Sequence, residues 1–277
     1  MRIGIVGLGL MGGSYAIGLS KKGHTIYGMD LNSETLNYAL ENHIIDSVLS
    51  ESNISLLDVL ILAIYPQSIL NFLKNYQKFF KKDLIITDIC GVKSSFVKEA
   101  TKLASPAIYC SAHPMAGKEK IGIEFADETI FIGANYIITP LEDTPQFAIK
   151  TLEKIGEDLG FAKISIVSPL VHDDMIGFTS QLTHAIAVSL VNSDHNEQTG
   201  DFIGDSYRDL TRIAMINENL WSELFLENKD FLLNHINQFE IELEKLKEAL
   251  KKNDKEELKK IFVQSTNIRK KMEKCAN

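Results

Sequence analysis

The sequence predicts an α/β protein with an N-terminal Rossmann-type, mostly parallel sheet and a C-terminal all-helical domain. Two observations predict the sheet. A short apolar strand at residues 2–6 runs into a glycine-rich turn and a helix, and further apolar runs then alternate with helical or loop segments. A third observation predicts the helical part, because strand patterns stop at Ser168-Pro169. We therefore expect two domains, residues 1–168 and residues 169–277.

The elements can be assigned in chain order. After the first strand we expect a helix over 14–22, a strand over 24–29 and a helix over 33–42, where Ser33 can cap the first turn. Later strands are expected at 59–63, 84–87, 108–111, 135–139 and 163–166. Continuous apolar runs of this kind are typical of parallel strands covered on both faces. Helices should follow over 170–193, around 207–216, over 220–251 and over 255–273.

Composition excludes several classes of protein. The chain has 277 residues, 45% hydrophobic, and a formal net charge of −8 without a basic face, which argues against a nucleic-acid partner. No apolar stretch reaches the roughly 18 to 20 residues of a membrane helix, and glycines interrupt the N-terminal apolar run where a signal peptide would need a continuous core. Three cysteines without a C-x-x-C pair suit a reducing compartment, so we expect a cytoplasmic protein.

A G-x-G-x-x-G turn follows the first strand. It consists of Gly7, Leu8, Gly9, Leu10, Met11 and Gly12. Gly7 permits the tight turn, Gly9 lets the backbone approach a pyrophosphate, and Gly12 allows close helix packing. Asp30 ends the second strand, where a carboxylate can hold a ribose 2′-hydroxyl and repel a 2′-phosphate. We therefore predict NAD rather than NADP. FAD stays open as an alternative, as does a plain turn in which Asp30 caps the next helix.

A second candidate site lies in residues 112–119, Ala-His-Pro-Met-Ala-Gly-Lys-Glu, after a late strand. Ligands on open α/β sheets bind beyond the carboxyl ends of the strands, so His113 is expected to face the nicotinamide. A histidine there can accept a hydroxyl proton near neutral pH. We also assign Ser111 to the substrate site. A structural histidine with satisfied hydrogen bonds is the alternative.

The H-P-M-A-G run resembles the active-site segment of prephenate dehydrogenases. Further segments that resemble this family are residues 87–93 (TDICGVK), residues 168–184 with Ser-Pro, His-Asp and SQLTH, and residues 207–214 (YRDLTRIA) with Trp221 after them. The resemblance covers residues 1 to about 230. It implies NAD-dependent oxidation of prephenate to 4-hydroxyphenylpyruvate in tyrosine biosynthesis, with loss of the ring carboxylate as carbon dioxide. It also implies a homodimer built through the C-terminal helical domain.

The resemblance assigns roles to individual residues. His113 would take the proton of the 4-hydroxyl, and Arg212 would pair with the ring carboxylate, for which the planar guanidinium fork is suited. Residues implied to line the pocket or its mouth are His184, Arg208, Trp221 and Glu119.

The charge of the substrate independently supports a binding role for two arginines. A dianion needs cations, and Arg208 and Arg212 are four residues apart, which places them on one side of a helix. The alternative is surface pairing with Asp205 or Asp209.

The sequence also departs from the family pattern. Some members carry a serine that contacts the catalytic histidine where this chain has Gly91. Ser94 or water could replace its hydroxyl, or nothing replaces it. A common histidine and proline are Gln181 and Thr183 here. Because of these departures, prephenate and arogenate both stay open as substrates.

Other interpretations are a β-hydroxyacid dehydrogenase, an imine reductase, and an NAD-binding sensor that has lost the chemistry. We expect no metal, because His172 and His184 would lie about 120° apart on a helix without further ligands at suitable spacing. Tyrosine is a candidate inhibitor that would bind in the active site as a product-like ligand.

Overall fold

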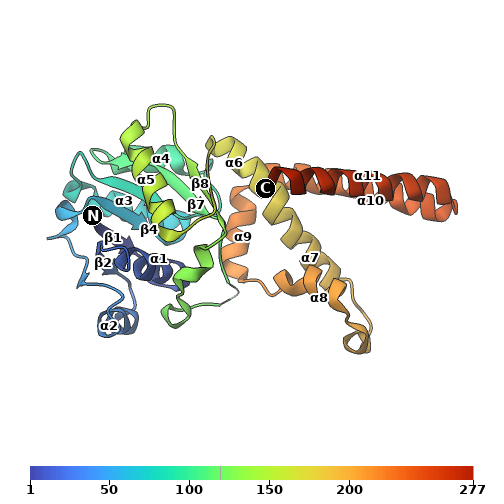
Figure 1. Ribbon diagram of the computed structural model, residues 1–277, viewed down its shortest axis with the longest axis horizontal. Coiled ribbons are helices and arrows are strands. Elements are labelled where there is room, and N and C mark those ends of the chain that lie inside the picture. Colours follow the sequence, from blue (N-terminus) through green and yellow to red (C-terminus); the bar gives the residue numbers. More distant parts are fainter. Residues whose placement is uncertain (119, 277) are drawn as a thin grey trace. The chain divides into compact units, whose positions relative to one another are not determined.

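The computed structural model describes residues 1–118 and 120–276, with side chains as far as Met272; Glu119 lies outside the described residues. Contacts divide the chain into two compact units, residues 1–228 and a second unit that begins at Lys229. The first unit contains the strands and helices α1 to α9, and the second contains α10 and α11 (Figure 1). The boundary that we predict at residue 168 falls inside the first unit, where the strands end and the helical segments begin.

The main sheet has the strand order β3-β2-β1-β4-β5-β6, with every neighbouring pair parallel. Its strands are β1 (Arg2–Val6), β2 (Thr25–Met29), β3 (Ser47–Val48), β4 (Val59–Leu62), β5 (Ile85–Asp88) and β6 (Ile108–Tyr109). The strand order reverses beside β1, so the glycine turn lies at the point where open α/β sheets bind ligands. The predicted fold class is confirmed.

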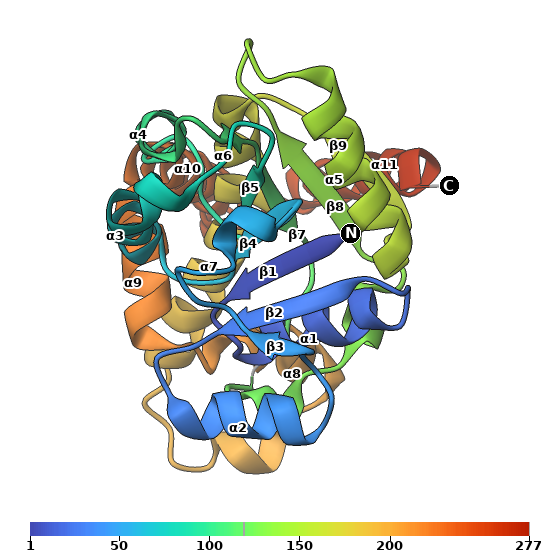
Figure 2. The same ribbon diagram turned by 90° about the vertical axis from the view of Figure 1, so that its left-hand side faces the viewer.

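Helices cover both faces of this sheet. They are α1 (Leu10–Ser20), α2 (Ser33–Glu41), α3 (Pro66–Tyr76), α4 (Val97–Ala104) and α5 (Gln146–Leu159). Figure 2 shows α1 and α5 on one side of the strands and α3 and α4 on the other. Ile3 and Ile5 of β1 belong to the first core, whereas Leu60 and Leu62 of β4 belong to the second, and all four are fully buried. Burial on both faces explains the continuous apolar runs in the sequence.

The last three strands form a separate sheet, which differs from our expectation of one sheet. They are β7 (Ser111–Pro114), β8 (Asn135–Thr139) and β9 (Lys163–Ile166), in the order β7-β8-β9. β7 runs antiparallel to β8, with His113 opposite Ile137. The predicted strand 108–111 is therefore divided at Cys110. Before it, the edge strand β6 ends the main sheet; after it, β7 pairs with β8, which returns antiparallel after the intervening loop. His113 consequently lies within a strand rather than after one.

The helical end of the first unit begins at the predicted Ser168-Pro169. Its helices are α6 (Pro169–Ile176), α7 (Leu182–Asn192), α8 (Asp205–Thr211) and α9 (Glu218–Glu227), with a π-helical segment at Gly177–Gln181 joining α6 to α7. Shorter 3₁₀ helices occur at Ile54–Leu56, Gln77–Phe79, Ile123–Phe125, Glu128–Phe131, Thr199–Phe202 and Arg212–Ala214, the last labelled η7.

Our prediction of one helix over residues 220–251 is wrong. α9 ends at Glu227, and α10 (Lys229–Lys251) begins after Asn228. The Asn228 side chain is buried, and its Nδ2 donates to the carbonyl of Asp173 at 2.9 Å and to Oε1 of Gln181 at 2.7 Å. A buried amide needs such hydrogen-bond partners, and Asn228 finds them at the point where the two helices separate. The apolar periodicity of the sequence runs on through this point, so the pattern alone predicts one continuous helix.

The second unit is a helical hairpin. α10 packs against α11 (Lys255–Ala276), and Asn253 in the connection has a positive φ of 49°, which asparagine tolerates. Ion pairs one turn apart, such as Lys245 with Glu242, lie along its exposed surface. No helix in the described part of the chain is both long and apolar enough to span a bilayer.

Candidate active site

The glycine turn is shaped by close backbone approach. Gly7 has a φ of +87° and donates its N–H to the carbonyl of Met29 at 2.8 Å. A Cβ on Gly12 would lie 1.8 Å from the Gly7 carbonyl oxygen, so the helix fits against the turn only without a side chain. A Cβ on Gly9 would meet nothing within 4 Å. The open side of Gly9 and the first amides of α1 therefore form a cradle suited to a pyrophosphate.

Side chains of the same segment face the protein. Leu8 and Leu10 are buried, and Met11 packs against the core on the α1 side of the sheet. The turn is thus anchored by its apolar side chains and leaves its backbone for a ligand.

Asp30 connects the end of β2 to the turn. Its Oδ2 accepts from the N–H of Leu8 at 2.7 Å, and its Oδ1 accepts from Asn32 at 2.9 Å. Asn32, whose side chain accepts from Glu34, is the N-cap of α2, so the expected cap at Ser33 is wrong and Ser33 is the first helical residue. The carboxylate of Asp30 is therefore held at the carboxyl edge of β1 and β2, beside the cradle.

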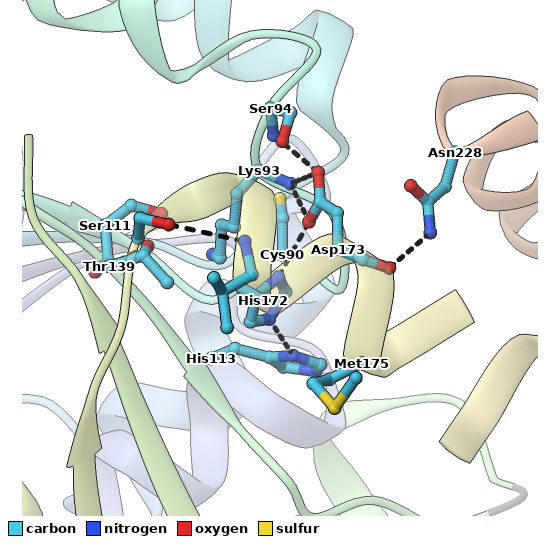
Figure 3. A network of polar contacts seen from close by, with 12 residues as sticks. Cys90, Lys93, Ser94, Ser111, His113, Thr139, His172, Asp173, Met175 and Asn228 are labelled. Atoms are coloured by element: carbon cyan, nitrogen blue, oxygen red, sulfur yellow. Dashed lines mark hydrogen bonds and ion pairs between the residues drawn. The ribbon is translucent and has the colours of Figure 1, made fainter. Parts of the chain in front are cut away.

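His113 forms a hydrogen-bonded chain with two residues of α6. Its Nδ1 lies 2.9 Å from Nε2 of His172, and Nδ1 of His172 lies 2.7 Å from Oδ1 of Asp173 (Figure 3). Ser168 caps α6 by accepting from the N–H of Val171, which fixes the start of the helix that carries both residues. His172 and Asp173 are each 1% exposed, whereas His113 is partly buried.

Backbone amides hold Asp173 from the other side. Lys93 donates its N–H to Oδ1 at 2.9 Å, and Ser94 donates its N–H to Oδ2 at 2.6 Å. Burial alone would raise the pKa of Asp173, but hydrogen bonds from His172 and Ser94 lower that pKa below its usual value. Asp173 is therefore an ionised acceptor at neutral pH.

A buried ion pair ties this region to the main sheet. Nζ of Lys93 lies 2.6 Å from Oδ1 of Asp88, and both side chains are fully buried. The same ammonium donates to the carbonyl of Ala112 at 2.7 Å, next to His113. Asp88 ends β5 and also accepts from the hydroxyls of Tyr109 and Ser111. The ion pair thus holds the His113 strand near the carboxyl end of β5, the edge of the sheet that also carries the glycine turn.

Burial keeps the histidines of this cluster neutral. Desolvation, with smaller contributions from His172 and Lys93, lowers the pKa of His113 well below its usual value. Desolvation also lowers the pKa of His172, although the contact with Asp173 opposes that shift. A neutral imidazole can accept a proton, which an imidazolium cannot. Burial raises the pKa of the Cys90 thiol, so this cysteine stays protonated.

Gly91 lies beside the His113 ring. A Cβ at this position would lie 3.8 Å from Cε1 of His113 and 3.6 Å from Cδ2 of Leu224 in α9. Nδ1 of His113 is bonded to His172, while Ser94 gives its N–H to Asp173. At its Nδ1, His113 therefore contacts His172, and the backbone N–H of Ser94 is engaged with Asp173.

His184 and Trp221 are brought together across two helices. Their rings stack with centroids 3.7 Å apart, and Nδ1 of His184 lies 2.9 Å from the carbonyl oxygen of Ser180. Gln181, the departure from the family pattern, is buried and donates to the carbonyl of Leu224 at 2.9 Å. Gln181 therefore ties α9, which carries Trp221, to the start of α7.

The arginines lie on a short helix. Arg208 in α8 pairs with Asp205 at 2.7 Å on the surface, which was the alternative to substrate binding. Arg212 follows α8 and donates its N–H to the carbonyl of Arg208, so the two residues lie one turn apart. α8 and η7 pack on α7, the helix that carries His184.

Two further predictions meet different outcomes. Glu119 lies outside the described residues. Ser111 is 1% exposed and its hydroxyl donates to Asp88, so the structure places it in the buried network rather than on a substrate surface.

In the described part of the chain, no group of three or more His, Cys, Asp or Glu side chains could hold a metal ion.

Sequence reasoning did not assign a role to Lys93, Asp173 or Asn228. The first two lie in the quoted segments TDICGVK and His-Asp, whose charged residues stand among apolar neighbours. That signal could have marked Lys93 and Asp173 as a buried polar group. Asn228 offers no comparable signal.

Comparison with known proteins agrees with this architecture. One family model, the prephenate dehydrogenase nucleotide-binding domain, matches residues 15–165, and another, the prephenate dehydrogenase dimerization domain, matches residues 168–264. A prephenate dehydrogenase of Bacillus subtilis is 30% identical over 96% of this chain and 74% of its own length.

Solved structures show the same likeness. The Aquifex aeolicus prephenate dehydrogenase, solved with hydroxyphenyl propionate and NAD+, has 30% identity and a TM-score of 0.89, covering 98% of each chain. The Synechocystis arogenate dehydrogenase has 27% identity and a TM-score of 0.85, covering 98% of this chain and all of its own. The chain therefore belongs to the prephenate dehydrogenase family.

Proposed function

We propose that this protein oxidises prephenate with NAD to give 4-hydroxyphenylpyruvate and carbon dioxide. The observation that carries this proposal is the neutral His113 ring, held on β7 at the edge of the sheet that also carries the glycine turn. Family membership and the Aquifex aeolicus structure solved with NAD+ support the same activity.

The residues around the turn fit NAD. The open side of Gly9 and the first amides of α1 would hold the pyrophosphate, and Asp30 would hold the ribose hydroxyls. When bound, NAD accepts the hydride from the ring carbon that bears the hydroxyl. The Asp30 carboxylate would repel a 2′-phosphate, which favours NAD over NADP.

His113 would accept the proton of the 4-hydroxyl as the carbonyl forms. The ring is already neutral because burial lowers its pKa, so no proton has to leave before the reaction. Restoration of an aromatic ring drives the loss of the ring carboxylate, so the protein's main tasks are orientation and proton acceptance.

Arg212 would bind the ring carboxylate, with His184, Arg208 and Trp221 near the side chain of the substrate. Replacing Arg212 with alanine should raise KM for prephenate about 10- to 100-fold, the equivalent of about 1.5–3 kcal/mol for a charged hydrogen bond. NAD affinity should not change. Arg2→Ala, at the start of β1, is the matched control. An unchanged KM in the Arg212 variant would remove this residue from the substrate site.

Arogenate is the second candidate substrate. The Synechocystis arogenate dehydrogenase supports it, because that protein resembles this chain over its whole length. The two substrates differ in a keto or amino group on the side chain, so the residues around His184 and Trp221 would determine the preference.

We propose that the protein acts as a homodimer, supported by the match to the dimerization domain. Light scattering during gel filtration would show the mass of one or two chains. Tyrosine remains a candidate inhibitor, to be tested by adding it to the activity assay. A cytoplasmic location is also proposed, since Cys90 and Cys110 are free thiols.

The decisive experiment measures NADH appearance at 340 nm with NAD and prephenate. Parallel reactions replace prephenate with arogenate, or NAD with NADP, and His113→Asn serves as the control for enzyme-dependent turnover. Turnover of prephenate with NAD is expected. No turnover with either substrate and either cofactor would contradict the proposed function.

A further inference from the structure

Catalysis by His113 requires one particular arrangement of protons. A neutral imidazole carries a proton on one ring nitrogen and a lone pair on the other. Nδ1 of His113 faces Nε2 of His172, so Nε2 is the nitrogen left for the substrate hydroxyl. Nε2 can accept a proton only if the hydrogen of His113 resides on Nδ1.

Asp173 determines where the hydrogens lie. Its ionised carboxylate can only accept, so Nδ1 of His172 must carry the hydrogen in their 2.7 Å contact. Nε2 of His172 is then a bare acceptor, and Nδ1 of His113 must donate to it. The chain of contacts therefore leaves Nε2 of His113 with its lone pair free.

The same three side chains, His113, His172 and Asp173, also stabilise the positive charge that His113 gains when it accepts the proton. His172 contacts the Asp173 carboxylate directly, whereas His113 has no such contact described and lies near the ammonium of Lys93. Sharing the Nδ1 proton of His113 with His172 moves part of the charge toward the carboxylate and away from Lys93.

We propose that His172 and Asp173 are positioning residues, which fix His113 in the tautomer with a bare Nε2 and stabilise the proton that it receives. This inference rests on the proposed function. As the O–H bond of the substrate breaks, its proton bonds to Nε2 of His113 and its electron pair forms the carbonyl while the ring carbon loses hydride to NAD. The Nδ1 proton of His113 stays in the hydrogen bond with His172.

The most informative substitution is Asp173→Asn, because the structure predicts how the new amide will orient. The N–H of Ser94 lies 2.6 Å from Oδ2. The N–H of Lys93 lies 2.9 Å from Oδ1 and also 3.2 Å from Oδ2, so only an oxygen at the Oδ2 position can accept from both backbone donors, and the single oxygen will stay there. The amide NH₂ then faces Nδ1 of His172 and donates to it. His172 must carry its hydrogen on Nε2, which forces the hydrogen of His113 onto its own Nε2.

His172→Gln separates the two parts of the proposal. The introduced amide can donate to Asp173 and accept from Nδ1 of His113 through its oxygen, so the tautomer is kept. An amide does not take up a proton at neutral pH, so the stabilisation of charge is lost. Asp158→Asn is the matched control, because Asp158 contacts His24 at 3.1 Å just before β2, at the opposite edge of the main sheet.

The experiment combines kinetics with histidine ¹⁵N NMR on the full-length protein, with His113→Asn used to assign the His113 signals. Asp173→Asn should lower kcat on the order of 10²- to 10⁴-fold, the range for loss of a correctly protonated base, with KM within about threefold. Its spectrum should show the hydrogen of His113 moved from Nδ1 to Nε2. His172→Gln should keep the Nδ1 hydrogen and lose less activity, and Asp158→Asn should change neither.

The spectra distinguish failure of this inference from failure of the proposed function. Wild-type protein with the His113 hydrogen on Nε2, or an Asp173→Asn variant with unchanged tautomer and kcat, would overturn the inference even if prephenate is turned over. Reversal of the tautomer in a protein that ignores prephenate would support the tautomer assignment and contradict the proposed function alone. Binding of NADH by each variant, followed by fluorescence, confirms that the variants are folded.

Discussion

The glycine turn and the His113 cluster place their functional groups by different means. The turn belongs to one βαβ unit, and the groups it offers to a ligand are backbone amides, with Asp30 added from the next strand. The cluster is built from side chains of β5, β7, α6 and the loop after β5, and Lys93 and Asp173 are 80 residues apart in sequence. One region therefore depends on local conformation and the other on tertiary contacts.

The difference predicts different responses to substitution. A backbone site is lost when a side chain fills its space, whereas a buried polar cluster is disrupted when any member loses its partner.

His113→Asn should affect turnover and leave the cofactor region intact. An asparagine amide can still donate to His172, but it cannot accept a proton at neutral pH. We expect kcat to fall on the order of 10²- to 10⁴-fold with little change in KM or in NADH affinity. His43→Asn is the control, because His43 is an exposed residue with a φ of 54°, which asparagine accommodates. Wild-type turnover in the His113 variant would remove this residue from the mechanism.

Lys93→Met should show how strongly the cluster depends on its buried ion pair. The substitution leaves Asp88 charged and fully buried without its ammonium partner. Breaking such a pair costs about 3–5 kcal/mol of the free energy of unfolding. Lys154→Met is the matched control. Nζ of Lys154 lies 2.7 Å from Oδ1 of Asp158, close to the distance in the buried pair, but the Lys154 side chain is 60% exposed. Urea denaturation of this variant should give a free energy of unfolding close to that of the wild type, because exposed ion pairs contribute little to stability. Equal costs in the two variants would contradict the distinction between the regions.

The same distinction explains how much the sequence could predict. The glycine spacing, Asp30 and the apolar runs are local patterns, so the parallel sheet, the turn and the start of the helices at Ser168 could be expected from them. The second sheet could not, because the pairing of β7 with β8 rather than β6 depends on where the loop between them returns. The partner of His113 was also missed, since no local pattern shows that α6 packs beside β7.

Gly9→Ala and Gly12→Ala should separate ligand binding from folding within the turn. At Gly9 a methyl group meets open space, so stability should change by no more than about 0.5 kcal/mol. NAD binding should weaken by more than roughly tenfold, because the methyl group occupies the pyrophosphate cradle and costs a charged hydrogen bond. At Gly12 the methyl group meets the Gly7 carbonyl, so the fold itself should be destabilised. Thermal unfolding with and without NAD measures both effects, and an unchanged NAD affinity in the Gly9 variant would place the cofactor elsewhere.

Acid should lower the free energy of unfolding through the histidines of the His113 cluster. The pKa values of His113 and His172 are lowered in the folded protein, whereas in the unfolded chain each histidine titrates near about 6.5. Below that pH the unfolded state binds more protons, so the free energy of unfolding falls as the pH drops toward the folded pKa values, by at most about 1.4 kcal/mol per pH unit for each histidine. The lowered pKa of Asp173 acts only at lower pH, where its carboxylate begins to protonate. Denaturation at pH 7.5, 6.5 and 5.5 should therefore show a smaller loss in a His113→Asn, His172→Gln double variant than in the wild type. The same loss in both proteins would assign the acid sensitivity to other histidines.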